Sequence, residues 1–189
     1  KTGTITATND SPTNDADNDY GNYATLNPLG GVTSGALTYS NGNKAVADAG
    51  AVYWASLSTI GMDLSLGGQF TFEAQLTTMS GGVRSGAALY MSDINVNAAS
   101  PNDQAECIAQ YHNDGTKQLK GVTTSYGASF TVGDRIAVEV DLDDDSVEFF
   151  KNDSSQGTIS SLGLPSTGIL HFGVTGGQSS VTAAYNAYF

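Results

Sequence analysis

Residues 132–158 read VGDRIAVEVDLDDDSVEFFKNDSSQGT, and this stretch decides the fold. Apolar and polar residues alternate along 135–142 and again along 146–150, which is typical of strands with one dry and one wet face. Three consecutive aspartates separate the two runs, and Lys151-Asn152-Asp153 follows the second. Because Asp and Asn favour turns, the stretch predicts two antiparallel strands joined by an acidic turn, with another turn after the second strand.

Short apolar runs continue along the rest of the chain. Residues 69–76 alternate as cleanly as the first stretch, and weaker strand candidates cover 4–8, 36–40, 51–56, 85–91, 105–111, 118–123, 169–175 and 180–185. Turn signals rich in Gly, Asn and Asp lie at 28–31, 41–42, 67–68, 80–82, 113–115 and 176–177. Strands separated by turns every ~8–12 residues favour a sandwich or barrel. We therefore predict an all-β domain over 23–189, preceded by a strand and a polar, acidic arm over 1–22.

The charge balance excludes several classes of partner. Seven basic residues stand against nineteen acidic ones, which gives a formal net charge of −12 and a pI near 4.1. Such a surface repels phosphate backbones and anionic lipids, so we expect no nucleic-acid partner.

No apolar stretch approaches the ~18 residues of a membrane span, so we expect no membrane insertion. The lone Cys107 excludes an internal disulfide.

The opening stretch resembles the signature of SPRY domains. That signature has Gly-Asp before an apolar strand, then Asp-Leu-Asp, a tight turn, a second strand and Lys-Asn-Gly; Asp153 replaces the last glycine here. Residues 11–14, 22–29 and 37–43 are similar to the opening segment of SPRY-containing bacteriophage proteins, and 185–189 to the closing strand of such domains. The resemblance implies a jelly-roll-like, concanavalin-like sandwich of two antiparallel sheets. Family members bind proteins or glycans through loops at one edge and are generally not enzymes.

The function expected from this resemblance is structural. We expect a non-enzymatic viral or phage protein on the virion surface, in a tail, fibre or capsid, and hence extracellular. Its expected partners are other virion subunits, further copies of itself, and a host-surface glycan or protein. The alternative is a secreted or cell-surface carbohydrate-binding module or lectin. A weaker third option is a glycan-active enzyme using Glu139 and Asp141, although their strand parity places both on the solvated face.

Five aromatic residues are candidates for ligand binding. Tyr53 and Trp54 are adjacent, so in a strand they point to opposite faces and one of them can be presented to a ligand. Tyr90, Tyr111 and Tyr126 are candidates for the lining of a glycan or peptide groove, because tyrosine stacks well and keeps a polar tip. The alternative for each is packing in the core.

The acidic arm holds a candidate calcium site. Asp15, Asp17 and Asp19 occupy alternate positions before Gly21, as in a loop of hard oxygen ligands. Tyr20 intervenes before the glycine, and Leu26 stands at the twelfth position where a glutamate is usual. The alternative is a solvated acidic loop. We expect no other cofactor, and we interpret His171 and Cys107 as structural residues.

Overall fold

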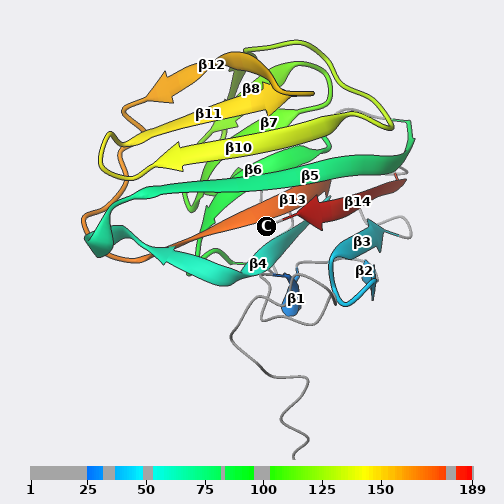
Figure 1. Cartoon of the computed structure of the whole chain (residues 1–189), viewed down its shortest axis with the longest axis horizontal. Coiled ribbons are helices and arrows are strands. Elements are labelled where there is room, and N and C mark those ends of the chain that lie inside the picture. Colours follow the sequence, from blue (N-terminus) through cyan, green and yellow to red (C-terminus); the bar gives the residue numbers. More distant parts are fainter. Residues whose placement is uncertain are drawn as a thin grey trace, which may run out of the picture.

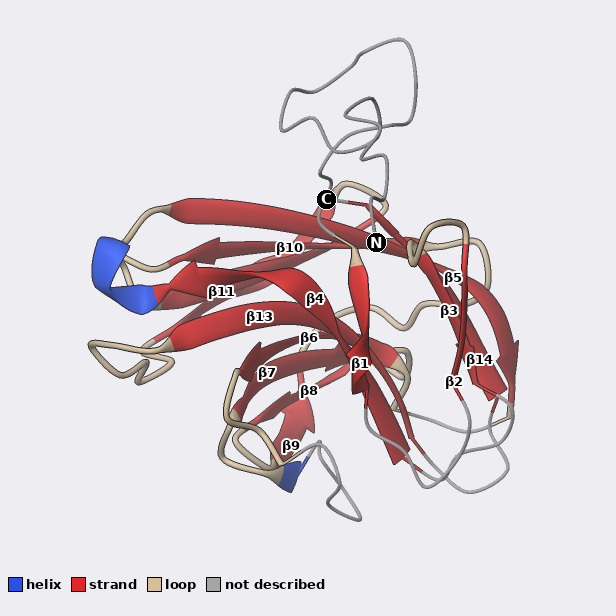
Figure 2. Ribbon diagram, turned by 90° about the horizontal axis from the view of Figure 1, so that it is seen from below, coloured by secondary structure: helices blue, strands red, loops and turns tan. Residues whose placement is uncertain are grey.

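The strands of this protein form two antiparallel sheets that pack face to face (Figures 1 and 2). The computed structural model describes residues 25–31, 37–48, 53–81, 84–95, 103–177 and 182–188. Sheet A consists, in spatial order, of β1 (Leu26–Gly31), β4 (Tyr53–Asp63), β13 (Ile169–Gly177), β6 (Gly86–Met91), β7 (Cys107–His112), β8 (Thr116–Leu119) and β9 (Val122–Ser125). Sheet B consists of β12 (Ser154–Ser160), β11 (Ser146–Lys151), β10 (Arg135–Asp141), β5 (Gln69–Ser80), β14 (Thr182–Tyr188), β3 (Ala45–Asp48) and β2 (Leu37–Ser40). The predicted all-β, two-sheet antiparallel sandwich is confirmed.

The hairpin predicted from residues 132–158 forms as expected. Strands β10 and β11 pair in a regular antiparallel register, with Val138 opposite Phe149 and Val140 opposite Val147. These apolar side chains are buried in the interior, whereas the alternate positions of β10 face outward. Asn152 and Asp153 form the next turn, with φ values of 47° and 66°. Asp153 therefore adopts the left-handed conformation for which the SPRY signature uses glycine, as the turn requires.

The main core fills the space between the sheets. Phe72 of sheet B stacks on Phe172 of sheet A with ring centroids 5.2 Å apart, and Trp54 meets Tyr185 edge-on at 6.2 Å. Each large apolar side chain removed from water contributes about 1.5–3 kcal/mol to folding. A smaller apolar cluster lies on the opposite, outer face of sheet A and consists of Ala55, Leu57, Ala88, Tyr90, Ile94 and Cys107.

Three local predictions were wrong. Residues 118–123 do not form one strand, because Lys120 and Gly121 turn the chain between β8 and β9 with φ values of 46° and 85°. Residues 28–31 belong to edge strand β1, and 176–177 belong to β13 rather than to a turn. Gly176 is needed for space: a Cβ there would lie 2.3 Å from the indole nitrogen of Trp54.

Besides β1, two strands of the sandwich had no counterpart in the sequence-based interpretation. These are β3, which pairs with β14 and β2, and β12, which forms the edge of sheet B beside β11. The strand expected at 4–8 and the arm over 1–22 lie outside the described residues, so the predicted boundary at residue 22 stays a prediction. Within the described ranges, no helix has the length and apolar character needed to cross a membrane.

Candidate functional site

The outer face of sheet B carries aligned rows of polar side chains. Across the sheet, Glu139 of β10 lies opposite Thr71 of β5 on one side and Glu148 of β11 on the other, and Thr158 of β12 follows Glu148. Directly opposed residues in antiparallel strands have Cβ atoms about 4.5–5.5 Å apart. The register therefore brings two carboxylates side by side on the wet face, with a hydroxyl group at each end of the row.

A cleft of about 340 Å³ opens over these rows. Beside the first row it contains Gln69 and Asp141, which also lie opposite each other, and Phe70, whose residue surface is 37% exposed. The full set of lining residues is Gln69, Phe70, Thr71, Glu139, Val140, Asp141, Ser146, Glu148 and Thr158. The lining thus combines three carboxylates, three hydroxyl groups and one amide, whereas Phe70 and Val140 lie opposite each other with the strand parity of the core residues.

Two of the three carboxylates are held by their neighbours. Asp141 accepts hydrogen bonds from the Gln69 side chain and from the backbone N–H groups of Asp144 and Asp143, and these bonds lower the pKa of its carboxyl group. Glu148 accepts hydrogen bonds from the hydroxyls of Ser155 and Thr158. The two side chains are therefore fixed on the sheet, and the lowered pKa keeps Asp141 ionised at neutral pH.

The third carboxylate, Glu139, is free. No hydrogen bond or ion pair to its side chain occurs among the described residues, and the side chain is exposed. Arg135, which has the same outward parity on β10, pairs with Glu73 at 3.0 Å. Like charges placed directly opposite each other destabilise a strand pair. The Glu139–Glu148 pair is thus an uncompensated negative site that an incoming cation would stabilise.

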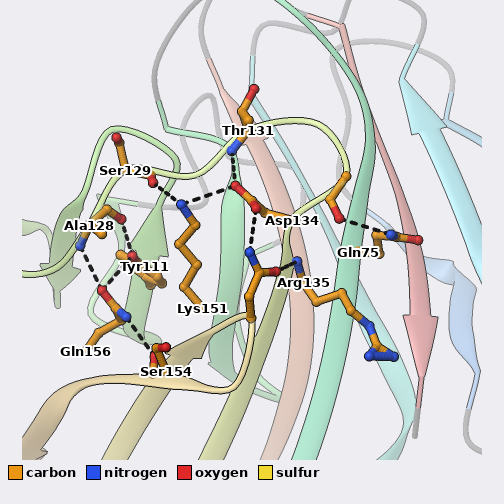
Figure 3. Close-up of polar contacts among 12 residues, drawn as sticks. Gln75, Tyr111, Ala128, Ser129, Thr131, Asp134, Arg135, Lys151, Ser154 and Gln156 are labelled. Atoms are coloured by element: carbon orange, nitrogen blue, oxygen red, sulfur yellow. Dashed lines mark hydrogen bonds and ion pairs between the residues drawn. The ribbon is translucent and has the colours of Figure 1, made fainter.

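A second polar cluster, at the opposite end of β10, is structural (Figure 3). Asp134 accepts hydrogen bonds from Asn152 Nδ2 at 2.6 Å and Thr131 N at 2.8 Å, and it pairs with Lys151 at 3.3 Å. Burial, which raises the pKa of Asp134, is outweighed by these partners, so that its pKa is lowered overall. Lys151 also donates to the carbonyl of Ser129 at 2.8 Å. The charged side chains of Asp134 and Lys151 thus hold the 126–134 loop against β11.

The five aromatic residues that were predicted to bind a ligand do not form a common surface. Trp54 and Tyr111 belong to the main core, and Tyr90 belongs to the small cluster outside sheet A; all three are at most 1% exposed. Tyr126 is half-buried, packs edge-on against Tyr111 and donates its hydroxyl to the carbonyl of Gly157. Tyr53 is half-buried at the start of β4. For Trp54, Tyr90 and Tyr111 the alternative, core packing, describes what the structure shows.

His112 and Cys107, both in β7, are buried, as expected of structural residues. His112 places Nε2 2.9 Å from Gln110 Oε1 and Nδ1 3.1 Å from Thr116 Oγ1. Gln110 donates in turn to Cys107 Sγ at 2.8 Å. Burial lowers the pKa of His112 to about 4 and raises the pKa of Cys107 to about 12, so both side chains are neutral at pH 7.

The candidate calcium ligands Asp15, Asp17 and Asp19 lie outside the described residues, so that site stays a prediction. Among the residues that the structure does describe, no group of three or more His, Cys, Asp or Glu side chains is placed to hold a metal ion.

The sequence-based interpretation missed most of the cleft. It placed Glu139 and Asp141 correctly on the solvated face, but it did not pair Glu139 with Glu148. The sequence contained the information for this pairing, because a hairpin that turns at residues 142–145 places residue 139 opposite residue 148. Thr71 and Thr158 come from strands that are remote in sequence or were not predicted, so no local pattern identified them.

Comparison with known proteins identifies the fold. No protein-family model and no curated protein sequence matches the chain. Among solved structures, the SPRY domain of human HERC1 matches with a TM-score of 0.66 at 15% identity, covering 86% of this chain and 96% of that one. The TRIM65 PSpry domain matches with a TM-score of 0.60 at 12% identity, covering 88% and 92%. A human SPRY domain matches with a TM-score of 0.57 at 13% identity, covering 79% and 94%.

These matches support the SPRY part of the resemblance and give no support to its bacteriophage part. Identities of 12–15% speak for the fold alone, since one fold serves many functions. The chain therefore has the SPRY fold.

Proposed function

We propose that this chain is a non-catalytic binding domain that makes protein–protein contacts through the acidic cleft on the outer face of sheet B. The observation that carries this proposal is the free Glu139 carboxylate beside Glu148 in an open cleft of about 340 Å³. The SPRY fold supports it, because the neighbouring SPRY domains belong to a family that typically mediates protein interactions.

The chemistry of the cleft favours a basic side chain of the partner. A guanidinium group can donate two parallel hydrogen bonds to a carboxylate. Glu139 and Glu148 supply the carboxylates. The hydroxyls of Ser146 and Thr158 add acceptors for the remaining N–H groups.

A peptide-display selection tests this contact. We expect the wild-type domain to enrich peptides that contain Arg or Lys, and the Glu139→Gln/Glu148→Gln variant to lose that enrichment. The matched control is Glu73→Gln, which removes a carboxylate of the same face that already pairs with Arg135. Equal enrichment by the wild type and the double variant would overturn the assignment of the cleft.

For the biological setting we retain the virion surface as a proposal. It is carried by the similarity of residues 11–14, 22–29 and 37–43 to phage SPRY proteins. A virion component, whether of tail, fibre or capsid, copurifies with particles at a fixed stoichiometry and contacts neighbouring subunits, including further copies of itself. Particles that lack the chain throughout would contradict this setting without affecting the proposal for the cleft.

A carbohydrate-binding module is the second candidate. The hydroxyl and amide groups of Thr71, Ser146, Thr158 and Gln69 line the cleft, and such a lining also suits a sugar. A glycan array distinguishes the two functions. Saturable glycan binding that Thr71→Val abolishes, without any selection of basic peptides, would favour the lectin over the protein-binding domain.

A further inference from the structure

Strand β9 (Val122–Ser125) forms one edge of sheet A, beyond β8 (Figure 2). All four of its residues are exposed, and Val122 is 64% exposed. Two other edges of the sandwich are irregular: β1 contains Pro28 and a register shift, and the pairing of β12 with β11 also shifts. The β8–β9 pairing is regular over all its residues. Unlike those two edges, β9 thus presents a regularly spaced row of backbone groups to a partner.

The turn geometry determines which backbone groups point outward. Lys120 and Gly121 both have positive φ, as in a two-residue hairpin turn, so Leu119 and Val122 are the hydrogen-bonded pair next to the turn. Hydrogen bonding alternates along an antiparallel ladder. The N–H and C=O groups of Thr123 and Ser125 therefore point away from β8, where an added strand would meet them.

This edge also carries unpaired positive charge in an acidic protein. Residues 115–133 contain Lys117 and Lys120 and no acidic residue, in a chain of net charge −12. Lys117 lies 5.0 Å above the centre of the Tyr126 ring, and Lys120 donates to the carbonyl of Gly163 at 3.0 Å. Both cations thus contact neutral groups.

Three other cations in the described part of the chain, unlike Lys117 and Lys120, form ion pairs with carboxylates. Arg84 pairs with Asp103, Arg135 with Glu73, and Lys151 with Asp134. Of the acidic residues near the β8–β9 hairpin, Asp114 accepts hydrogen bonds from the hydroxyl and the backbone N–H of Thr116, and Asp103 accepts one from Gln118 at 2.6 Å. Asp93 and Glu106 line a shallow pocket together with Lys120. Within the described part of the chain, none of these carboxylates forms an ion pair with Lys117 or Lys120.

We propose that the edge of β9 receives an extended, acidic segment of a partner protein as an added β-strand. Backbone hydrogen bonds to Thr123 and Ser125 would supply the affinity, and Lys117 and Lys120 would select carboxylates on the incoming strand. Pairing of β9 with β9 of a second copy is disfavoured, because it would gather four lysines of two chains along one edge. This surface is separate from the acidic cleft and selects the opposite charge.

Fluorescence anisotropy with a defined probe tests the proposal. The probe is a labelled nine-residue peptide in which Thr or Val alternates with Glu, and the control peptide carries Lys in place of Glu. The key variant is Thr123→Pro, which removes an outward N–H and leaves the bonds to β8 in place. Its matched control is Thr123→Val. We expect wild type and Thr123→Val to bind the acidic probe within about twofold of each other, and Thr123→Pro about tenfold more weakly.

The charge requirement has its own variant. Lys117→Gln/Lys120→Gln should weaken the acidic probe about tenfold, and the lysine peptide should not bind the wild type. Equal binding by Thr123→Pro and Thr123→Val, when circular dichroism shows both folded, would overturn the proposal. So would equal binding of the two peptides, or an oligomer of the free chain that Thr123→Pro dissociates. Glu139→Gln/Glu148→Gln should bind the acidic probe normally, so failure of the cleft and failure of this edge are distinguishable.

Discussion

The outer faces of both sheets carry polar side chains, but those of sheet B line an open cleft and those of sheet A are buried. On sheet B, Glu139 and Glu148 are charged and lie in an open cleft. On sheet A, Gln110 and His112 are fully buried, neutral and hydrogen-bonded to each other. Polar groups that satisfy one another serve to define a packed structure, whereas a free carboxylate is available to a ligand.

This difference assigns separate roles to the two faces. The buried network of sheet A begins at Cys107 and continues through Gln110 and His112 to Thr116. Its members have partners and little contact with solvent, so a change there acts on stability. Under the proposed function, a change in the cleft of sheet B should act on binding and leave the fold intact. The predictions below test that division.

The largest contrast is expected in thiol reactivity. Cys107 is 1% exposed and burial raises its pKa to about 12, so the native thiol is protonated and inaccessible. A Ser160→Cys variant places a second thiol on the outer face of sheet B, where Ser160 is exposed. Labelling with a thiol reagent should be at least about 1,000-fold faster at position 160 than at Cys107, because Cys107 reacts through unfolding. Similar rates would show that the sheet A face is open.

A pair of glutamine substitutions tests the same division by stability. Gln110→Ala removes a buried amide that contacts His112 and Cys107, and it should lower the free energy of unfolding by about 2–4 kcal/mol. Gln69→Ala removes an exposed amide that bonds to Asp141 and should cost less than about 0.5 kcal/mol. Urea unfolding of both variants measures the difference. Equal losses would contradict the division.

The buried histidine makes stability depend on pH. Its pKa is about 4 in the folded state against 6.5 for an unperturbed histidine, so the unfolded chain binds the proton first. Stability is therefore full above pH 6.5 and falls by about 3 kcal/mol as the pH drops to 4. The half-buried His171, whose pKa is also lowered by burial, adds a smaller loss in the same direction.

His112→Gln should flatten most of this slope, with the part due to His171 remaining. Unfolding free energies measured from pH 7.5 to pH 4 in both proteins check the expectation. An unchanged slope in the variant would show that His112 is protonated in the folded state.

The smallest effect is expected in the cleft itself. Glu139→Gln removes one of two directly opposed carboxylates and should raise the free energy of unfolding by about 0.2–1 kcal/mol. The gain should shrink in high salt, because screening weakens the repulsion that the substitution relieves. A loss of stability in urea unfolding would mean that Glu139 has a structural partner.

The sequence predicted the parts of this fold that local patterns control. Alternation along 135–142 placed Glu139 and Asp141 outside and the valines of β10 inside, as observed. The acidic turn and the Asn152-Asp153 turn follow from residue types that favour turns. The hairpin at Lys120-Gly121 was missed because lysine is uncommon in a turn that needs positive φ at both central residues.

Burial of polar and aromatic residues could not be predicted in the same way. Tyr90 and Tyr111 resemble surface tyrosines in sequence, and their burial depends on strands and loops remote along the chain, such as β13 beside β6 and the 126–134 loop beside Tyr111. The cleft likewise joins four strands of sheet B, one of which was not predicted. Local periodicity reports which face a residue points to, and the tertiary structure decides whether that face meets water.

The most direct test of the division between the two faces is a titration with a basic peptide selected by the wild-type domain. Isothermal titration calorimetry would compare wild type, Glu139→Gln/Glu148→Gln, and His112→Gln. We predict an affinity at least about tenfold weaker for the cleft variant and unchanged for His112→Gln. Unchanged affinity in the cleft variant, or an equal loss in both variants, would contradict the account.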